Sequence, residues 1–453
     1  MLALLLLAQL SIDLRDWPVR IGPEAQMFID DHLIAKRTNV DFEVHNPRKH
    51  PSNPILEAAK PQETYLLVYG STIHDKASNK FRMWYTNNIG IAYAESPDGV
   101  RFKRPDNYQL TKGHRGRSDT LTIFQDPQGL YRAYVMEYRY PDKDGIREQR
   151  REGIYLRTSK DGIQWEERFD PVMLAGWRNP ADQLPGAQWD LGDVHHIAWD
   201  PKLKKYIGHI KLVNEGIRMR GMAESEDGVY WSDPRLILKA DEKDRPGDQL
   251  YSMIAFPYES AWIGFLGVYH KGTDERMDIQ LVTSRDGRHW SRHLRTPFLP
   301  NGPDNSWDWG ILHMGQNPPV RVNDELRIYY GGGGSPHNVR IRDSKGFGIG
   351  LATLRPEGFV SLDAKTQPGE IVTRPLHSTG TKLTLNAAVQ QQGSIQVTLL
   401  NADGTTIAES EPITGDSLRA PVRWKTAAAI PTNKDYRLQF RITNASLYAF
   451  RVE

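Results

Sequence analysis

The chain has 453 residues, of which 39% are hydrophobic and 25% are charged, proportions typical of a globular protein. Its 58 basic and 56 acidic residues leave a formal net charge of +2, so composition gives no electrostatic case for nucleic acid or an anionic membrane as a partner. The absence of cysteine excludes disulfides, thiolate metal sites and a cysteine nucleophile.

Residues 1–11 resemble a signal peptide. The first ten residues (MLALLLLAQL) form an uncharged apolar run, which is too short for a membrane span of about 20 residues. Small residues at Ala8 and Ser11 lie near a possible cleavage point. We therefore expect a secreted or periplasmic protein with no membrane span, the alternative being an apolar leader without a targeting role. Residues 12–60 are rich in Pro and Asn and are expected to wrap the next domain.

A short turn pattern recurs along the middle of the chain. The pattern is Ser-x-Asp-Gly followed by an aromatic residue, and a fifth, degenerate copy lies at 354–359. Its four clear copies begin at Ser96, Ser159, Ser225 and Ser284. In each, Asp accepts hydrogen bonds from the turn backbone and Gly can adopt a positive φ. Because segments of alternating apolar and polar residues precede each copy, the pattern indicates a hairpin between strands.

The spacing of about 60 to 70 residues fits one four-stranded unit, so residues 61–360 are predicted to form a five-bladed β-propeller. After about residue 360 the sequence becomes rich in Thr, Ala, Gln and Val, and segments such as 395–400 and 436–442 alternate. These features predict a small C-terminal β-sandwich over 361–453. The fold class expected from the sequence is therefore all-β.

In a propeller, residues at the start of each innermost strand converge on one end of the axis. One acid precedes each predicted innermost strand: Glu63, Asp119, Asp193, Asp248 and Asp308. Carboxylates gathered in one pocket repel each other, which separates their pKa values and suits acid and base chemistry on a glycosidic bond. Asp119, Asp193 and Asp248 are the expected catalytic residues. The alternative is that these acids cap loops or bind an axial water or cation.

Other polar and aromatic residues in or beside the same strands are expected to bind substrate, together with Glu63 and Asp308. They are Glu137, Trp189, His196, Tyr251, His270, Trp307 and His313. Trp and Tyr side chains can pack against the faces of sugar rings. The alternative is that the histidines are buried core residues and the tryptophans pack loops. Since neighbouring residues of a strand point to opposite faces, at most one of His195 and His196 faces the cleft. No phosphate-binding loop, HExxH motif or nucleophile elbow is present, so no cofactor or metal is expected.

Several motifs resemble those of five-bladed glycoside hydrolases related to families 32, 43, 68, 117 and 130, and especially an exported planctomycete-type branch. They are FIDDHLI at 28–34, Asn-Pro at 46–47, HPSNPIL at 50–56, the repeated turn, and ASLYAF at 445–450. The resemblance implies an Asp base in the first blade, an Asp modulator in the second and a Glu acid in the third. Asp119 matches the modulator, and Asp193 stands where Glu is expected.

We therefore expect a glycoside hydrolase that acts on a plant or algal oligo- or polysaccharide. Asp193, beside Trp189, is the expected general acid, Asp119 orients the sugar, and the base is sought among Asp248, Glu63 and Asp31, with Asp30 as a further candidate. A non-catalytic carbohydrate-binding propeller and a structural or partner-binding surface protein stay open as alternatives. A sialidase would need an arginine triad, for which the candidates are Arg117, Arg139 and Arg218, and normally six blades.

Overall fold

The computed structural model describes residues 17–59, 61–110, 118–138, 152–175, 189–339 and 346–453. Across these ranges the regular structure is β-strand, apart from one 3₁₀ turn at Asp31–Leu33. The all-β class expected from the sequence is confirmed. The expected signal peptide, Arg117 and Arg139 lie outside the described residues. No helix in the described ranges has the length and apolar character needed to cross a membrane.

The chain divides into two compact units. One is continuous and comprises Asn46–Pro356, while the other combines residues 17–45 with Glu357–Glu453. These boundaries differ from the predicted ones, because the expected wrapping segment is split between the units. Residues 17–45 share a sheet with the C-terminal strands.

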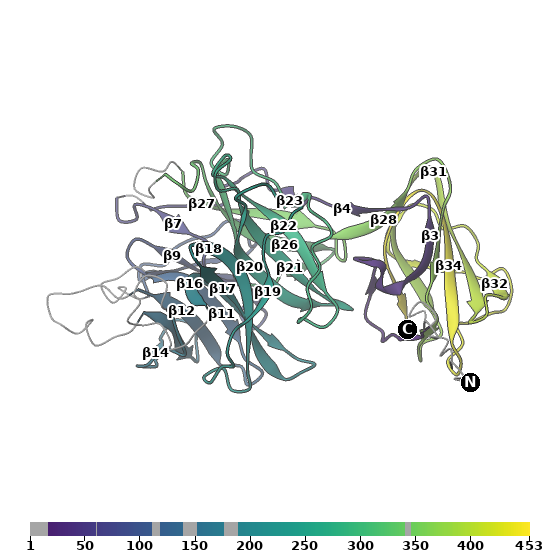
Figure 1. Cartoon of the computed structure of the whole chain (residues 1–453), viewed down its shortest axis with the longest axis horizontal. Helices are drawn as coiled ribbons and strands as arrows, with labels where there is room; N and C mark the ends of the chain where they lie inside the picture. Colours follow the sequence, from purple (N-terminus) through teal and green to yellow (C-terminus); the bar gives the residue numbers. More distant parts are fainter. Residues whose placement is uncertain (1–16, 60, 111–117, 139–151, 176–188, 340–345) are drawn as a thin grey trace, which may run out of the picture. The chain divides into compact units, whose positions relative to one another are not determined.

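Asn46–Pro356 is a β-propeller of antiparallel sheets that follow one another along the chain (Figure 1). The first sheet contains β7 (Leu66–Leu67), β8 (Thr72–Asp75), β9 (Lys80–Asn87) and β10 (Ile91–Ser96). The second contains β11 (Ser118–Gln125), β12 (Tyr131–Glu137), β13 (Gly153–Ser159), β14 (Glu166–Glu167) and β15 (Met173–Leu174). The third contains β16 (Asp190–Asp200), β17 (Lys205–Asn214), β18 (Ile217–Ser225) and β19 (Arg235–Leu238).

A larger sheet completes the propeller and consists of two antiparallel sets. The first set is β20 (Gln249–Tyr258), β21 (Ala261–Tyr269), β22 (Met277–Ser284) and β23 (Pro297–Leu299). The second is β24 (Ile311–Met314), β25 (Val320–Val322), β26 (Glu325–Gly333) and β27 (Gly348–Leu354). One parallel pair, Met277 with Ile311, joins the sets. Two short strands from the start of the unit, β5 (Arg48–Lys49) and β6 (Leu56–Glu57), pair with β27. The number of blades stays a prediction.

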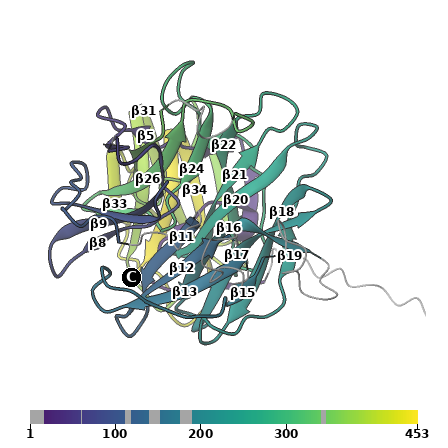
Figure 2. The same ribbon diagram turned by 90° about the vertical axis from the view of Figure 1, so that its left-hand side faces the viewer.

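The first strands of successive sheets lie beside one another at the centre of the propeller. Figure 2 shows β11, β16 and β20 in this position, and β16 is in contact with both β11 and β20. This arrangement brings the starts of distant strands together, which is the geometry that the sequence predicted for the site.

The repeated turns connect neighbouring sheets through side chains of the preceding sheet. Tyr134 on β12 donates a hydrogen bond of 3.0 Å to the carbonyl of Gly228, and Arg132 donates one of 2.9 Å to the carbonyl of Asp227. Trp84 and Arg82 of the first sheet bind Gly162 and Asp161 of the second in the same way, at 2.8 and 2.6 Å. Each of these repeated turns therefore also forms a contact between neighbouring sheets.

The same contact links the end of the propeller to its beginning. Tyr329 on β26 donates a hydrogen bond of 2.9 Å to the carbonyl of Gly99, and Arg327 donates to that of Asp98. The fourth turn lacks this contact among the described residues, because fully buried His209 occupies the position that Tyr134 has in the second sheet. Trp290 of the turn itself donates to the Gly287 carbonyl instead, at 3.1 Å.

The second unit is a β-sandwich assembled from both of its chain segments (Figure 1). Its N-terminal strands are β1 (Val19–Arg20), β2 (Gln26–Met27), β3 (Ile34–Thr38) and β4 (Asp41–Val44). Its C-terminal strands are β28 (Val360–Ala364), β29 (Gly369–Thr373), β30 (Leu376–His377), β31 (Leu383–Asn401), β32 (Thr406–Glu409), β33 (Asp416–Pro421) and β34 (Tyr436–Val452). Phe28 packs against Phe440 and Phe450 in its core, with ring centroids 5.9 and 5.7 Å apart.

Candidate active site

Two of the predicted acids meet at one tyrosine. The hydroxyl of Tyr138, just after β12, lies 2.8 Å from Oδ2 of Asp119 on β11 and 2.8 Å from Oδ2 of Asp193 on β16. Both carboxyl groups are buried, with 3% and 4% of each residue exposed. The two sheets also contact each other directly, since Thr120 Oγ1 donates to the Asp193 carbonyl at 2.6 Å. The structure therefore brings Asp119 and Asp193 together, as the sequence predicted.

β-Bulges at the starts of the first strands set the positions of these acids. Asp119 and Asp193 lie four residues before Ile123 and Ile197, which pair with equivalent positions of the second strands. In the next sheet the equivalent residue is Ala255, paired with Gly264, and counting back four residues leads to Tyr251. The register partner of the two acids in β20 is therefore Tyr251, and Asp248 lies outside that position.

Lys211 on β17 connects Asp193 to Tyr251. Its ammonium lies 2.5 Å from Asp193 Oδ1 and 3.6 Å from the centre of the Tyr251 ring. Burial lowers the pKa of Lys211 to about 8, although the neighbouring Asp193 carboxylate acts in the opposite direction. Lys211 has no exposed surface, so its charge is compensated inside the protein by a carboxylate and an aromatic face.

Aromatic and histidine side chains complete this region. Tyr69 Oη lies 3.1 Å from Nδ1 of His313, and His337 Nε2 lies 3.2 Å from Tyr251 Oη. Burial lowers the pKa of His313 to about 3 and that of His337 to about 4, with nearby positive charge adding to the effect. Both imidazoles are therefore neutral at physiological pH. We call Asp119, Tyr138, Asp193, Lys211, Tyr251 and His313 the axial group.

Two predicted acids belong to other networks. Glu63 is fully buried in the first sheet and accepts hydrogen bonds from Tyr85 at 2.9 Å, Asn87 at 2.7 Å and Arg104 at 2.8 Å. Asp308 forms an ion pair of 2.6 Å with Lys49 in the last sheet. Each acid thus binds residues of its own sheet or of the segments beside it, so the structure does not bring Glu63 and Asp308 into the axial group.

Asp248, the third expected catalytic acid, is engaged with His270. The imidazole lies between two carboxylates, with Nδ1 2.8 Å from Asp248 and Nε2 3.1 Å from Asp278. Burial alone would lower the pKa of His270, but the hydrogen bonds and charges of Asp278 and Asp248 outweigh burial and raise it. The structure thus places Asp248 and His270 in one buried ion-pair network of their own.

Three further residues that were predicted to bind substrate, Glu137, Trp307 and Trp189, lie outside the axial group. Glu137 forms an ion pair with Arg157 of the neighbouring strand. The Trp307 ring lies against Gly332 and Gly350, 5.5 Å from the Tyr330 ring. Trp189 is half-buried just before β16.

His196 is buried between sheets, and its Nδ1 accepts a bond of 3.4 Å from the Ala255 amide. Burial, with the neighbouring His209 adding to it, lowers the pKa of His196 well below its usual value. Asp30 and Asp31 make their described contacts inside the sandwich, where Asp30 caps the 3₁₀ turn and Asp31 pairs with Arg37 at 3.3 Å.

Tyr138 and Lys211 were not among the predicted site residues. Lys211 carried a detectable signal, because a lysine inside an otherwise apolar strand must find a partner. Tyr138 gave no such signal in the sequence, because a tyrosine directly after a strand is not unusual.

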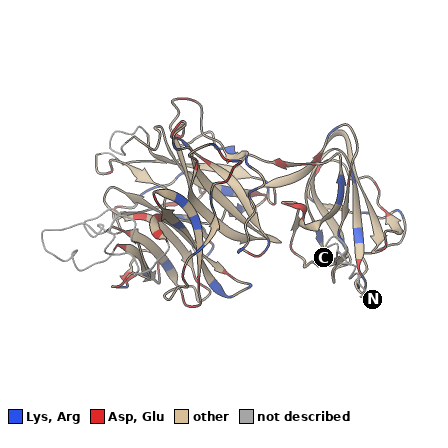
Figure 3. Ribbon diagram, viewed as in Figure 1, with Lys and Arg blue, Asp and Glu red and all other residues tan. Residues whose placement is uncertain are grey.

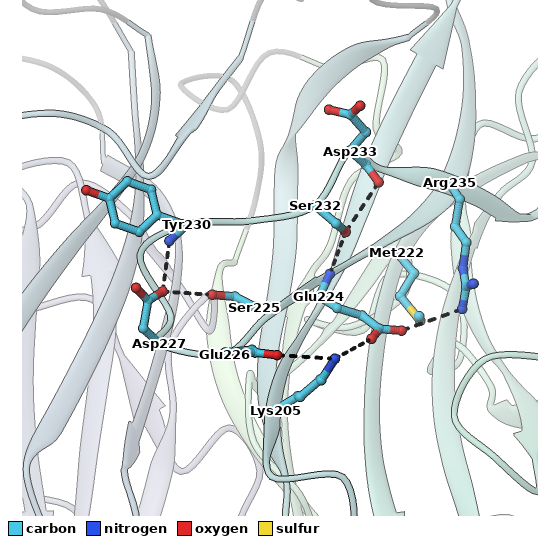
Figure 4. A pocket seen from close by; sticks show the side chains of 10 residues that line it. All are labelled: Lys205, Met222, Glu224, Ser225, Glu226, Asp227, Tyr230, Ser232, Asp233 and Arg235. Carbon is cyan, nitrogen blue, oxygen red and sulfur yellow. Dashed lines mark hydrogen bonds and ion pairs between the residues drawn. The ribbon is translucent and has the colours of Figure 1, made fainter.

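A separate hollow of about 560 Å³ lies at the outer edge of the third sheet (Figure 4). Its side chains bind each other: Lys205 pairs with Glu224 and Glu226, and Asp227 accepts a hydrogen bond from the Tyr230 amide. The hollow contains none of the predicted site residues. Acidic and basic residues are interspersed over the strands of the propeller (Figure 3), and the described residues hold no cluster suited to a metal ion.

Comparison with known proteins finds no matching family model and no matching curated protein. Solved structures do match. A β-1,2-mannobiose phosphorylase from Listeria innocua has a TM-score of 0.50 and 12% identity, covering 71% of this chain and 98% of that one. A structure described as a glycoside hydrolase has a TM-score of 0.49 and 13% identity, covering 68% and 92%. A glycosyl hydrolase from Bacteroides ovatus has a TM-score of 0.48 and 13% identity, covering 70% and 95%. The expected resemblance is confirmed at the level of the fold: the chain contains a propeller of the glycoside hydrolase type.

Proposed function

We propose that this protein is a glycan-processing enzyme that cleaves a glycosidic bond with Asp119 and Asp193. The observation that carries the proposal is the Tyr138 hydroxyl, which contacts both buried carboxyl groups at 2.8 Å. Since each carboxyl oxygen lies that far from the same atom, the two oxygens can be separated by at most twice this distance. Carboxyl groups about 5 Å apart serve retaining glycosidases, whereas inverting enzymes need a wider gap. We propose retaining chemistry, because this bound on the oxygen–oxygen distance is compatible with the closer spacing.

Proton counting assigns a role to each acid. Two hydrogen bonds at one phenol oxygen need two protons, of which the phenol supplies one and a carboxylic acid supplies the other. The ammonium of Lys211, 2.5 Å from Asp193, favours the charged form of that carboxyl group. For retaining chemistry we therefore assign the nucleophile to Asp193 and the proton donor, which then acts as the base, to Asp119. This differs from the sequence-based expectation, in which Asp193 was the general acid.

The proposed substrate is an oligo- or polysaccharide, in keeping with the fold type. The matched Listeria innocua structure is described as a complex with β-1,2-mannobiose, so its bound ligand is also an oligosaccharide. The plant or algal origin of the glycan stays a prediction. We also propose export of the protein on the basis of residues 1–11, and N-terminal sequencing of secreted material tests it.

Carbohydrate binding without catalysis is a second candidate function. It is favoured by the burial of both carboxyl groups, which expose only 3% and 4% of their residues in this state of the protein. A purely structural role of the Asp193–Lys211 ion pair would produce the same burial. Activity measurements on matched variants separate the two functions.

The test is a screen of purified protein against a glycan panel, with and without inorganic phosphate, followed by Asp119→Asn and Asp193→Asn. Loss of a general acid or nucleophile should reduce kcat by at least about 100-fold. Asp248→Asn is the matched control, because this equally buried acid lies outside the axial group, and it should keep activity within a few fold. Glycan binding without turnover by the wild type, or full activity in both variants, would contradict the proposed catalysis.

A further inference from the structure

Arg220 is a fully buried cation beside the axial group. It lies on β18 directly opposite Lys211 on β17, and neither residue has exposed surface. Burial lowers the pKa of Arg220 to about 9, although the negative charge of Asp193 acts in the opposite direction. The guanidinium is therefore charged at neutral pH, and a charge at such a buried position needs polar groups around it.

The described hydrogen bonds of this guanidinium all go to backbone carbonyls. Nη1 donates to Tyr251 at 3.0 Å, and Nη2 donates to Val194 and to His209 at 3.3 Å each. The acceptors lie on β20, β16 and β17, and β20 belongs to the next sheet, which is in contact with β18 (Figure 2). Arg220 thus connects the main chains of two neighbouring sheets.

Two of these acceptors lie in the β-bulges of the axial group. In β16 the register shifts over a stretch that contains Asp193 and Val194. In β20 the bulged residue is Tyr251. A bulge interrupts the regular ladder of hydrogen bonds, so the position of a bulged residue depends on contacts from outside the ladder. One guanidinium supplies such a contact to both bulges.

These contacts affect both neighbours of Lys211. Val194 directly follows Asp193, whose own carbonyl accepts a hydrogen bond of 2.6 Å from Thr120 of the preceding sheet. Tyr251, whose ring centre lies 3.6 Å from the Lys211 ammonium, is bound by the same guanidinium as Val194. Arg220 therefore fixes the two residues that Lys211 contacts relative to each other.

We propose that Arg220 is a positioning residue for the catalysis proposed above, on which this inference rests. Its guanidinium fixes the bulges of β16 and β20, and so holds Asp193 in place for attack and Tyr251 against Lys211. Neighbouring strands lie about 4.8 Å apart, so β16 is roughly 10 Å from β18. At the end of a long side chain, a planar guanidinium can bind several acceptors at once, whereas a lysine ammonium is a compact point charge.

The first test compares the kinetics of Arg220→Lys with those of a matched control, Arg292→Lys. Arg292 is 7% exposed and binds Asp244 at 2.6 Å and Gln280 at 2.9 Å, outside the axial group. Both variants keep the charge and lose the planar set of donors, so both should lose some stability. Kinetics are therefore measured at a temperature at which circular dichroism shows both variants folded.

With a substrate found in the glycan panel, Arg220→Lys should lower kcat about 10- to 100-fold at nearly unchanged KM. The reason is that a displacement of about 1 Å at the nucleophile slows the chemical step without weakening ground-state binding. Arg292→Lys should keep kcat within a few fold of the wild type. Arg220→Met, which removes the charge and all the donors, should lose more kcat than Arg220→Lys, and Arg220→Lys decides the outcome if Arg220→Met does not fold.

The second test, hydrogen–deuterium exchange of the full chain followed by mass spectrometry, needs no substrate. In Arg220→Lys the amides in the bulges of β16 and β20 should exchange faster than in the wild type, while those of β26 keep their rate. Arg292→Lys should leave the exchange of both bulges unchanged.

Three results would each overturn the positioning role while the proposed catalysis stands: equal kcat in Arg220→Lys and Arg292→Lys, a change in KM alone, or unchanged exchange at both bulges. A wild type that turns over no glycan would instead overturn the proposed catalysis, and this role with it.

Discussion

The ammonium of Lys211 lies 2.5 Å from Asp193, and neither side chain is appreciably exposed. A buried ion pair of this kind gains little over an apolar pair of similar shape, but removing one partner leaves an uncompensated charge. The contact therefore makes the charge of Asp193 and the stability of the propeller depend on the same lysine.

Replacing only one member of this pair should be costly. Asp193→Asn keeps the shape of the side chain but leaves Lys211 without its counter-charge, so we expect the free energy of unfolding to fall by about 3 kcal/mol or more. Adding Lys211→Met removes the stranded charge and should recover most of that loss. Urea unfolding of the wild type, Asp193→Asn, Lys211→Met and the double variant forms a double-mutant cycle, which measures the coupling free energy between the two residues. Additive effects of the two substitutions would show that the pair does not control stability.

The pH dependence of stability provides a second measure of Lys211. Its pKa of about 8 in the folded protein lies below the ordinary value of 10.5, so between these pH values the unfolded chain binds more protons. The wild type should therefore gain stability relative to Lys211→Met as pH rises from 8 to about 10, with a slope up to ~1.4 kcal/mol per pH unit. Parallel stability curves for the two proteins would contradict the burial of a charged lysine.

A methyl group at the third turn should weaken the contact between sheets. Gly228 has a φ of 76°, and a Cβ there would lie 2.3 Å from Tyr134 Oη. Gly216 has the same φ but no neighbour within 4 Å of its Cβ position. Gly216→Ala should cost about 1 kcal/mol from backbone strain, and Gly228→Ala about 1–3 kcal/mol more from the clash. Thermal or urea unfolding measures both, and equal costs would exclude tight docking of the turn.

His209 is a position where the protein can be stabilised. It is fully buried, neither ring nitrogen has a partner among the described residues, and burial lowers its pKa to about 3. His209→Phe removes two unsatisfied polar atoms and should raise stability by about 1 kcal/mol at pH 7.

The gain from His209→Phe should increase at acidic pH. The unfolded wild type takes up a proton at this residue below about pH 6.5, whereas the folded wild type resists protonation down to about pH 3. The difference between variant and wild type should therefore widen as pH falls from 6.5 towards 4. A variant less stable than the wild type at both pH values would show that the histidine is satisfied or that Phe does not fit.

The repeated turns could be predicted because their determinants are local. Asp161 and Gly162 shape their turn with neighbours a few residues away, and alternation identified most of the longer strands. The short strands between residues 17 and 45 could not be predicted as part of the sandwich. For example, β3 pairs with β29 more than 300 residues later, and two- to five-residue strands carry little periodicity.

Four of the six members of the axial group, Asp119, Asp193, Tyr251 and His313, were predicted from the sequence. Asp119 and Asp193 lie in the β-bulges of β11 and β16, whereas Asp248 precedes β20 and lies three residues before the bulge position Tyr251. The equivalence of Tyr251 with the two acids follows only from the pairing of Ala255 with Gly264, which the sequence does not reveal. Tyr138 contacts Asp193 of the next sheet, and Lys211 contacts Asp193 from the neighbouring strand. Both are contacts between side chains, which leave no periodic signal in the sequence.

The continuous propeller is inserted in the chain between two segments of the sandwich, and this order has a consequence for biosynthesis. A ribosome completes β1 to β4 first, but releases their partners β28 to β34 only after all of Asn46–Pro356. Domains generally fold as units while the chain emerges. The propeller can therefore close through Tyr329 and Gly99 while the first four strands still expose unpaired edges. During that interval a nascent chain carries strand edges that invite pairing with other chains, so chaperone dependence and the main risk of aggregation should reside in the sandwich.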